Sequence, residues 1–282
     1  MKFTARTAMD EDYRSIVGLC RRAIGPRDYV ISILKYLIAD GGLLLAFHER
    51  ELVGITNFEK CIDRSAWLGQ ARTDPSWRRK GVAVFLQRAV STEARKRGLK
   101  TVRMWVRGGN LPAIGAGEKG GYTPVCELVH LRKRIRSLRG PITRPMKSID
   151  RTFAISTLWS SPILQASNGY LAHSWHIIRP NPSSLMTIAG RGEFYSGKDG
   201  LFIFSQSEKW SRRFYPSLSV LRGPIRDVLK AVAGIPHVGK SRTLGTYAPN
   251  DPFIVRNLIR NGFKIDDWGD RCIVYEKRLA SN

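Results

Sequence analysis

A short basic segment that ends in glycine has the residue types best suited to a chemical task in this 282-residue sequence. Gly81 follows three cations and precedes apolar residues at helical spacing, among them Val82 and Leu86. The first turn of a helix carries unpaired N–H groups and a partial positive charge, so it favours a phosphate, which glycine lets approach closely. The segment predicts a pyrophosphate site or, alternatively, solvated cations; its members are Arg78, Arg79, Lys80, Gly81, Val82 and Ala83.

Two flanking segments give this loop a family context. Thr73-Asp74-Pro75-Ser76-Trp77 precedes the loop, and Asn110-x-x-Ala113-Ile114 runs on to Glu118-Lys119-Gly120-Gly121-Tyr122. Together with the loop they resemble the motifs of the GNAT superfamily of acetyl-CoA-dependent N-acetyltransferases, whose signature is Arg/Gln-x-x-Gly-x-Gly/Ala at the start of the helix after the fourth strand. The resemblance therefore implies acetyl-CoA as the co-substrate.

The resemblance also assigns residues beside the loop. Main-chain groups of Ala71, Arg72 and Thr73, at the end of the fourth strand, are expected to bind the pantetheine arm. Asn110 is expected either to hold the cofactor or substrate or to form a turn. The cofactor site is thus expected to extend from the end of this strand to the start of the helix.

Acetyl transfer to an amine needs a group that removes a proton, because a free lysine amine has a pKa of about 10.4. Family enzymes often use a glutamate or an ordered water for this task. Glu59, at the end of a predicted strand, is the acidic candidate, and Gln70 is a candidate for positioning a water molecule. The alternative for Glu59 is a solvent-facing residue at a strand end.

The position of the family's general acid departs from the pattern. Gly117 stands where the family often has a tyrosine that protonates the leaving thiolate. Release of the thiolate to water, a proton from Tyr195 or Tyr215, and loss of activity are the alternatives that remain. Further aromatic residues of the second half are candidates for its core or for an acceptor cleft: Trp159, Tyr170, Trp175, Phe194, Trp210 and Phe214.

Apolar patterns predict an α+β fold with a mixed central sheet flanked by helices. The basic connector over residues 132–152 contains Gly140-Pro141 and marks a boundary, so the first domain is expected to cover residues 1–140. Its predicted helices lie near residues 13–20, 31–38, 82–96 and 110–119, and its predicted strands over 3–7, 43–47, 52–58, 66–73, 102–106 and 125–131.

Residues 141–282 are expected to form a second, degenerate domain of the same kind without a cofactor loop. The segments Gly120-Gly121-Tyr122 and Asn261-Gly262-Phe263 lie 141 positions apart, which favours a tandem duplication. Pro224 removes an N–H at the presumed helix start, where no Arg-x-x-Gly-x-Ala pattern occurs. In this half we expect a helical stretch near residues 152–171, strands between 175 and 204, a helix over 224–232 and a strand over 272–275.

A formal net charge of +24 favours binding to polyanions. Both halves are basic, so a single basic tail does not cause the net charge; solubility alone is the alternative explanation.

The cysteines Cys20, Cys61, Cys126 and Cys272 lack the spacing of a metal or redox motif. From this spacing we expect no metal site. No apolar run is long enough to be a leader or to span a bilayer, so we expect a cytoplasmic protein with no membrane partner.

These observations favour an N-acetyltransferase that moves an acetyl group from acetyl-CoA to a primary amine. The acceptor could be a protein amine or a small molecule, and the cationic surface slightly favours an acidic or nucleic-acid-associated target. A GNAT-like module that binds nucleic acid or ribosomes with little catalysis is the alternative of a different class.

Overall fold

The computed structural model describes residues 1–135, 142–205, 215–235 and 243–280, which divide into two compact units. The first unit comprises residues 1–104, 110–123 and the chain from Tyr275 onward. The second comprises residues 105–109 and 124–274. This division does not coincide with the predicted boundary at residue 140, because the chain from Pro124 belongs to the second unit and the last strand contributes to the first. The first unit is therefore discontinuous in sequence.

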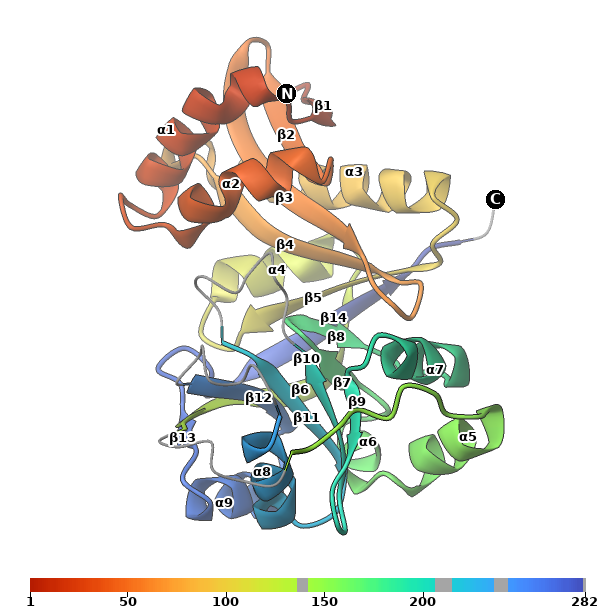
Figure 1. Ribbon diagram of the computed structural model, residues 1–282. Coiled ribbons are helices and arrows are strands. Elements are labelled where there is room, and N and C mark those ends of the chain that lie inside the picture. Colours follow the sequence, from red (N-terminus) through yellow and green to blue (C-terminus); the bar gives the residue numbers. More distant parts are fainter. Residues whose placement is uncertain (136–141, 206–214, 236–242, 281–282) are drawn as a thin grey trace. The chain divides into compact units, whose positions relative to one another are not determined.

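The first unit is built on strands in the order β1-β2-β3-β4-β5-β14 (Figure 1). Its first four strands pair antiparallel, whereas β4 and β5 are parallel. Helices α1 and α2 pack on one face of these strands, and α3 packs on the other (Figure 1). The strands are β1 (Thr4–Thr7), β2 (Leu43–His48), β3 (Glu51–Lys60), β4 (Ala66–Thr73), β5 (Thr101–Arg107) and β14 (Cys272–Arg278), and the helices are α1 (Tyr13–Ala23), α2 (Tyr29–Ala39), α3 (Val82–Lys96) and α4 (Leu111–Lys119), with 3-10 turns η1 (Asp10–Asp12) and η2 (Pro75–Trp77).

Polar contacts explain where α2 begins and how β14 is held. Asp28 starts α2 by accepting a hydrogen bond from the Val30 amide. The guanidinium of Arg103 on β5 is buried and pairs with Asp63 and with Glu276 on β14. Because a buried cation is costly unless it is paired, Glu276 helps to fix the last strand in this unit.

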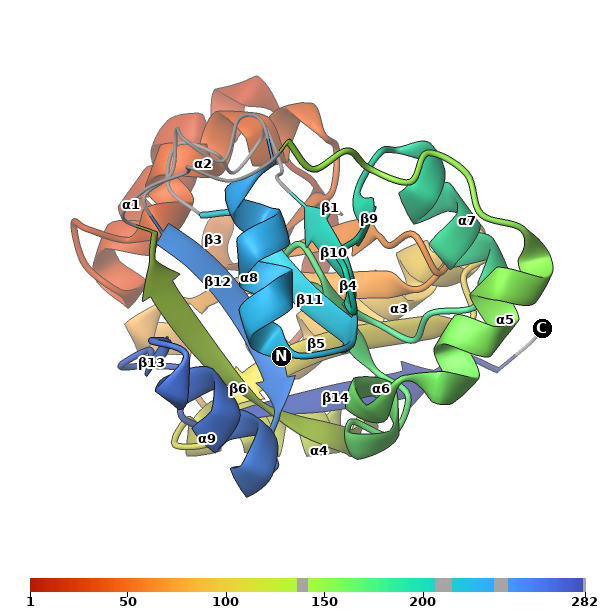
Figure 2. The ribbon, with the colours of Figure 1, turned by 60° about the horizontal axis from the view of Figure 1, so that its bottom comes forward.

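The second unit has strands in the order β6-β12-β11-β10-β9, with β13 beside β6. The β11–β12 pair is parallel, and the other neighbours are antiparallel. In Figure 2, α8 lies over the strands of this unit. The elements are β6 (Thr123–Arg134), α5 (Arg151–Ser160), α6 (Pro162–Ala166), β7 (Leu171–His173), β8 (His176–Ile178), α7 (Pro182–Gly190), β9 (Phe194–Ser196), β10 (Leu201–Ser205), β11 (Ser217–Arg222), α8 (Ile225–Ala233), β12 (Thr243–Pro249), α9 (Pro252–Arg260) and β13 (Lys264–Ile265).

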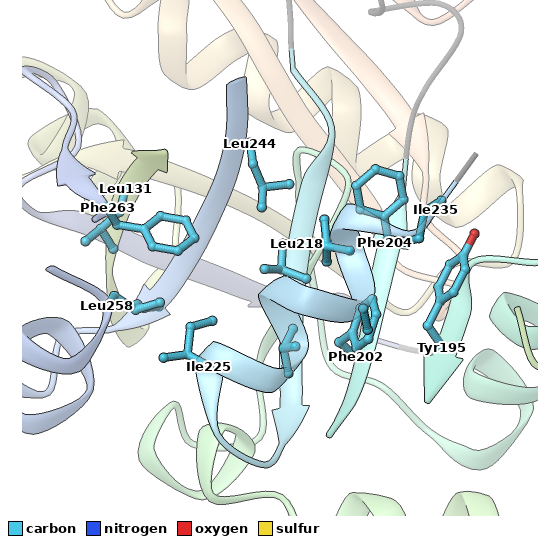
Figure 3. Close-up of a cluster of buried hydrophobic side chains, with 14 of the residues drawn as sticks. Leu131, Tyr195, Phe202, Phe204, Leu218, Ile225, Ile235, Leu244, Leu258 and Phe263 are labelled. Atoms are coloured by element: carbon cyan, nitrogen blue, oxygen red, sulfur yellow. The ribbon is translucent and has the colours of Figure 1, made fainter. Parts of the chain in front are cut away.

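The core of the second unit lies between these strands and the helices α8 and α9. Figure 3 shows Phe202, Phe204 and Leu218 on the strands, with Ile225 at the start of α8. Leu258 on α9 and Phe263 after it complete the same buried cluster. Burial of these apolar side chains is the main favourable term that holds this unit together.

The two units share a strand–helix–strand–helix segment of the same order. In the first unit it is β4-α3-β5-α4, and in the second it is β11-α8-β12-α9, with a parallel strand pair in each. Helices α4 and α9 are both nine residues long, and their starts at 111 and 252 are 141 positions apart, the spacing seen in the sequence echo. The two units thus share this order of elements, and the duplication itself stays a prediction.

Two expectations for the second half are confirmed only in part, because helices α5 and α6 and strands β8, β9 and β10 lie in the predicted ranges. The predicted helical stretch near residues 152–171 is broken after α5, where Ser161 caps a new short helix that begins with Pro162, and a strand starts at Leu171. The predicted run of strands between 175 and 204 contains α7, whose start is capped by Asn181 and Ser184. Among the described residues, we find no helix with the length and hydropathy to cross a bilayer.

Candidate functional site

The start of α3 has the backbone geometry of an anion site. Gly81 caps the helix in the left-handed region, with φ 88° and ψ 2°, and the Phe85 amide donates the first helical hydrogen bond to the Gly81 carbonyl at 2.9 Å. No side chain of the described residues caps this end. A Cβ at Gly81 would meet nothing within 4 Å. The amides of the first turn therefore have neither an acceptor within the helix nor a capping side chain among the described residues.

The turn before Gly81 is tied down by Asp74. Its carboxylate accepts hydrogen bonds from the Ser76 amide and hydroxyl at 3.1 and 2.7 Å and from Arg22 Nε at 2.7 Å. Burial of the Asp74 carboxyl opposes ionisation, but these hydrogen bonds outweigh it and lower its pKa. Arg78 adds a second link, because its guanidinium donates to the Ala23 carbonyl at the end of α1, at 2.8 Å. These contacts anchor the segment before Gly81 to α1.

The three cations of the loop differ in what they do. The Arg78 side chain is used to hold α1, whereas Lys80 Nζ lies 4.6 Å from the centre of the Trp77 ring. Arg79 is exposed and has φ 64°, so the backbone reverses just before the helix. Arg79 and Lys80 are exposed near the helix start, where their positive charges would attract an anion.

Next to this helix start, β4 parts from β5. The described ladder between the two strands has two residue pairs, Ala66–Val102 and Trp67–Arg103, although β4 continues to Thr73. A bulge lies in the same stretch: Ile55 pairs with Arg72 and Asn57 with Gly69, so β4 has one extra residue between them. Main-chain groups of β4 beyond Trp67 are therefore not engaged by β5 in this ladder.

Gln70 occupies this bulge with φ 52°. Its side-chain Oε1 is buried, and no hydrogen-bond partner for it occurs among the described residues. A buried polar atom without a partner is costly and is often satisfied by water or a ligand. Gln70, the residue predicted to position a water molecule, therefore has a hydrogen-bond acceptor, Oε1, at the bulge.

Arg72 uses its side chain for structure. The guanidinium donates to both oxygens of Asp28 at 2.7 Å, and the Asp28 side chain is fully buried. This paired contact ties β4 to the start of α2. The cofactor role predicted for Arg72 was a main-chain one, and it stays a prediction, as it does for Ala71 and Thr73.

Glu59 is largely buried on β3. Burial raises the pKa of its carboxyl to about 7, although a hydrogen bond from Asn57 Nδ2 to Glu59 Oε1, at 2.9 Å, lowers it. Gly54 on the same strand faces Val82 and Leu86 of α3, so the alternation of a strand directs Asn57 and Glu59 to the opposite face, toward α1 and α2. This face also carries the Arg72–Asp28 pair. A carboxyl with a pKa near neutrality can accept a proton at physiological pH.

Asn110 and Gly117 lie at either end of α4. The Asn110 side chain accepts a hydrogen bond from the Ala113 amide at 3.3 Å, so it caps the helix, which agrees with its turn-forming alternative. Gly117 is buried, and a Cβ there would lie 2.7 Å from Met104 Cε. The position of the family's tyrosine therefore has no hydroxyl and is closely approached by Met104.

The singled-out aromatic residues of the second unit differ in burial. Tyr170, Phe194 and Tyr195 are buried, whereas Trp159 is 80% exposed. The Tyr215 hydroxyl donates to Asp266 at 3.0 Å, and burial raises its pKa. Trp210 and Phe214 lie outside the described residues. The four cysteines are buried and form no disulfide bond, and the described residues contain no cluster that could hold a metal ion.

Comparison with known proteins places this geometry in a family. Residues 10–122 match the acetyltransferase (GNAT) family. This part of the chain is a GNAT domain. The family consists of acyltransferases that use acetyl-CoA and act on amines. A comparison with curated proteins finds no match.

Solved structures share the fold over nearly the whole chain. A GCN5-related N-acetyltransferase from Sphaerobacter thermophilus is similar at a TM-score of 0.58 and 14% identity, covering 99% of this chain and 96% of its own. A protein from Thermoplasma acidophilum named as a candidate acetyltransferase has a TM-score of 0.54 and 14% identity, with 98% and 93% covered. These similarities show the fold, a mixed sheet flanked by helices, as the GNAT resemblance implied.

Sequence reasoning missed the residues that hold the segments of the candidate site in place. Asp28 and Asp74 were not singled out as anchors, and Asn57 was not connected to Glu59. Local signals for the first two exist, since Asp28 directly precedes an apolar helix and Asp74 precedes Pro75. Their arginine partners lie 44 and 52 positions away, which no local pattern reveals.

The buried carboxyl of Glu59 predicts a pH-dependent effect on stability. Its pKa is raised in the folded state, so ionisation at high pH destabilises the fold, and the effect vanishes below the unfolded value near 4.5. Glu59→Gln should raise the free energy of unfolding by about 3 kcal/mol above pH 8 and by almost nothing at pH 4. Urea denaturation at both pH values measures this, with the exposed Glu49→Gln as control. Equal effects of Glu59→Gln at the two pH values would contradict the assignment.

Proposed function

We propose that the GNAT domain transfers an acetyl group from acetyl-CoA to a primary amine. The observation that carries this proposal is the start of α3, where Gly81 opens a helix without a side-chain cap beside the parted edge of β4. Acetyl-CoA, when bound, would supply the acetyl group as a reactive thioester. The chain's own residues would then bind its anionic part, orient its arm and move a proton.

The proposed binding residues follow from their backbone positions. The amides of Gly81, Val82 and Ala83 would hold the pyrophosphate, because the first turn of a helix offers N–H groups and a positive dipole end. Arg79 and Lys80 add positive charge, whereas Arg78 acts by holding the loop to α1. Main-chain groups of Ala71, Arg72 and Thr73 would bind the pantetheine arm along the edge of β4 that continues beyond its described pairs with β5. Asn110 contributes by capping α4.

Glu59 is the proposed proton acceptor. Its raised pKa of about 7 means that a substantial fraction is ionised at neutral pH, yet the carboxylate is basic enough to take a proton from an ammonium group through water. The buried Oε1 of Gln70 is the proposed acceptor that orients this water. Because position 117 offers no hydroxyl, the thiolate of coenzyme A would be protonated by solvent.

The acceptor amine is proposed to belong to a protein. The net charge of +24 repels cationic small amines and attracts acidic surfaces, which supports a target that is acidic or associated with nucleic acid. A small-molecule amine is the alternative acceptor. Binding of nucleic acid or ribosomes with little catalysis is supported by the same charge, and failure to bind acetyl-CoA would favour it.

Cofactor binding can be tested with two matched substitutions on α3. Gly81 and Gly98 flank the same helix, both have positive φ, and neither would place a Cβ within 4 Å of another atom. Gly81→Glu puts a negative charge at the helix start and should weaken acetyl-CoA binding by about tenfold or more, whereas Gly98→Glu should leave it unchanged. Isothermal titration calorimetry measures both dissociation constants. Equal dissociation constants for the two variants, or no heat with the unmodified protein, would refute the site.

A pH–rate profile tests the role of Glu59. With any acceptor amine that supports turnover, kcat/KM should rise with pH through an inflection near 7, because the ionised carboxylate is the active form. Glu59→Gln should lower the rate about 100-fold and remove this inflection. Asn57→Leu removes the hydrogen bond that stabilises the carboxylate and should move the inflection to higher pH. An unchanged inflection in the glutamine variant would assign the base to another group.

A further inference from the structure

The second unit contains a hollow of about 90 Å³ at the opening of its own parallel strand pair. Strands β11 and β12 share one described parallel pair, Ser217–Gly245, as β4 and β5 share two. The start of α8 and one face of α9 close the hollow on its other sides. By its elements, this is the place in the second unit that corresponds to the proposed acetyl-CoA site in the first.

Its lining is mostly aliphatic and also includes Thr246, Tyr247 and Asn257. Val220, Ile225, Ala248, Ile254 and Leu258 supply aliphatic surface, and Phe253, 78% exposed, stands at the rim. Figure 3 shows two of these residues, Ile225 and Leu258, as members of the buried cluster of this unit. Leu258 stands in α9, 141 positions after Gly117 in α4, so a large apolar side chain replaces a glycine at corresponding helix positions. Such a surface favours an apolar ligand.

The start of α8 is not suited to a phosphate. Pro224 stands at the cap without an N–H, and Asp227 places a negative charge in the first turn. Gly223 has φ 94°, but a Cβ there would lie 2.1 Å from the Asp199 carbonyl oxygen, so this glycine is required by packing against the chain at Asp199 and Gly200. Of the features described for the loop at Gly81, the start of α8 therefore repeats the glycine with positive φ but offers fewer N–H groups to an anion.

We propose that this hollow is a second binding site, which takes a short aliphatic chain of a neutral ligand. A volume of 90 Å³ equals that of about three water molecules at roughly 30 Å³ each, so it accommodates a chain of only a few carbons. Binding strength comes from burial of methylene groups and should increase about fourfold for each one that enters the hollow. This site is independent of the proposed acetyl transfer.

Methyl NMR of the full-length protein with a series of 1-alkanols tests the proposal. Titration with 1-propanol through 1-hexanol should shift the methyl signals of Ile163, Ile225 and Ile254 in a saturable way, whereas Ile33 in the first unit stays unchanged. The dissociation constant should fall about fourfold per added carbon and then level off once the hollow is filled. Non-saturable shifts, or shifts spread equally over both units, would overturn the proposal.

Two tryptophan substitutions on α9 provide the matched control. Ile254 lines the hollow and is partly exposed, while Ile259 is 45% exposed on the same helix and does not line it. Ile254→Trp should abolish alkanol binding, and Ile259→Trp should preserve it; circular dichroism confirms that both variants are folded. Retained binding in Ile254→Trp would overturn the assignment. Saturable shifts of the Ile163 and Ile225 methyl signals on addition of acetyl-CoA would also overturn it, because they would indicate a second cofactor site.

Discussion

The unpaired amides at the start of α3 are the feature on which the rest of the proposed site depends. A helix start offers several N–H groups in one direction, and here the residue that precedes them is glycine in the left-handed conformation, without a capping side chain among the described residues. The N–H groups of such a helix start need a hydrogen-bond acceptor, which can be water or a ligand. The surrounding contacts serve this arrangement, since Asp74 fixes the preceding turn and Arg78 ties it to α1.

The cost of charge burial explains how the other candidate residues are divided between structure and chemistry. Arg72 and Asp28 neutralise each other on the α1 and α2 face, so neither is available for catalysis. The carboxyl of Glu59 is partly buried, and burial raises its pKa to about 7 although the hydrogen bond from Asn57 lowers it. A carboxyl whose pKa is shifted toward neutrality is a functional candidate on physical grounds.

The sequence was sufficient to predict features that depend on local pattern. The loop at Gly81, the helix that follows it and the mixed α+β fold rest on spacing and on the GNAT motifs. The two segments of the sequence echo directly follow helices α4 and α9, which start 141 positions apart. Features that depend on distant pairing could not be predicted. The last strand joins the first unit through Glu276 and Arg103, which lie 173 positions apart. Helix α7 is a different case, because its cap at Asn181 and Ser184 is a local signal that the predicted run of strands overlooks.

The most direct test of the central claim is a map of backbone amide shifts on titration with acetyl-CoA. The account predicts that the amides of Gly81, Val82 and Ala83 shift most, while those at the start of α8, Ile225 to Asp227, stay unchanged. Largest shifts at any other helix start, or no shifts at millimolar ligand, would contradict it.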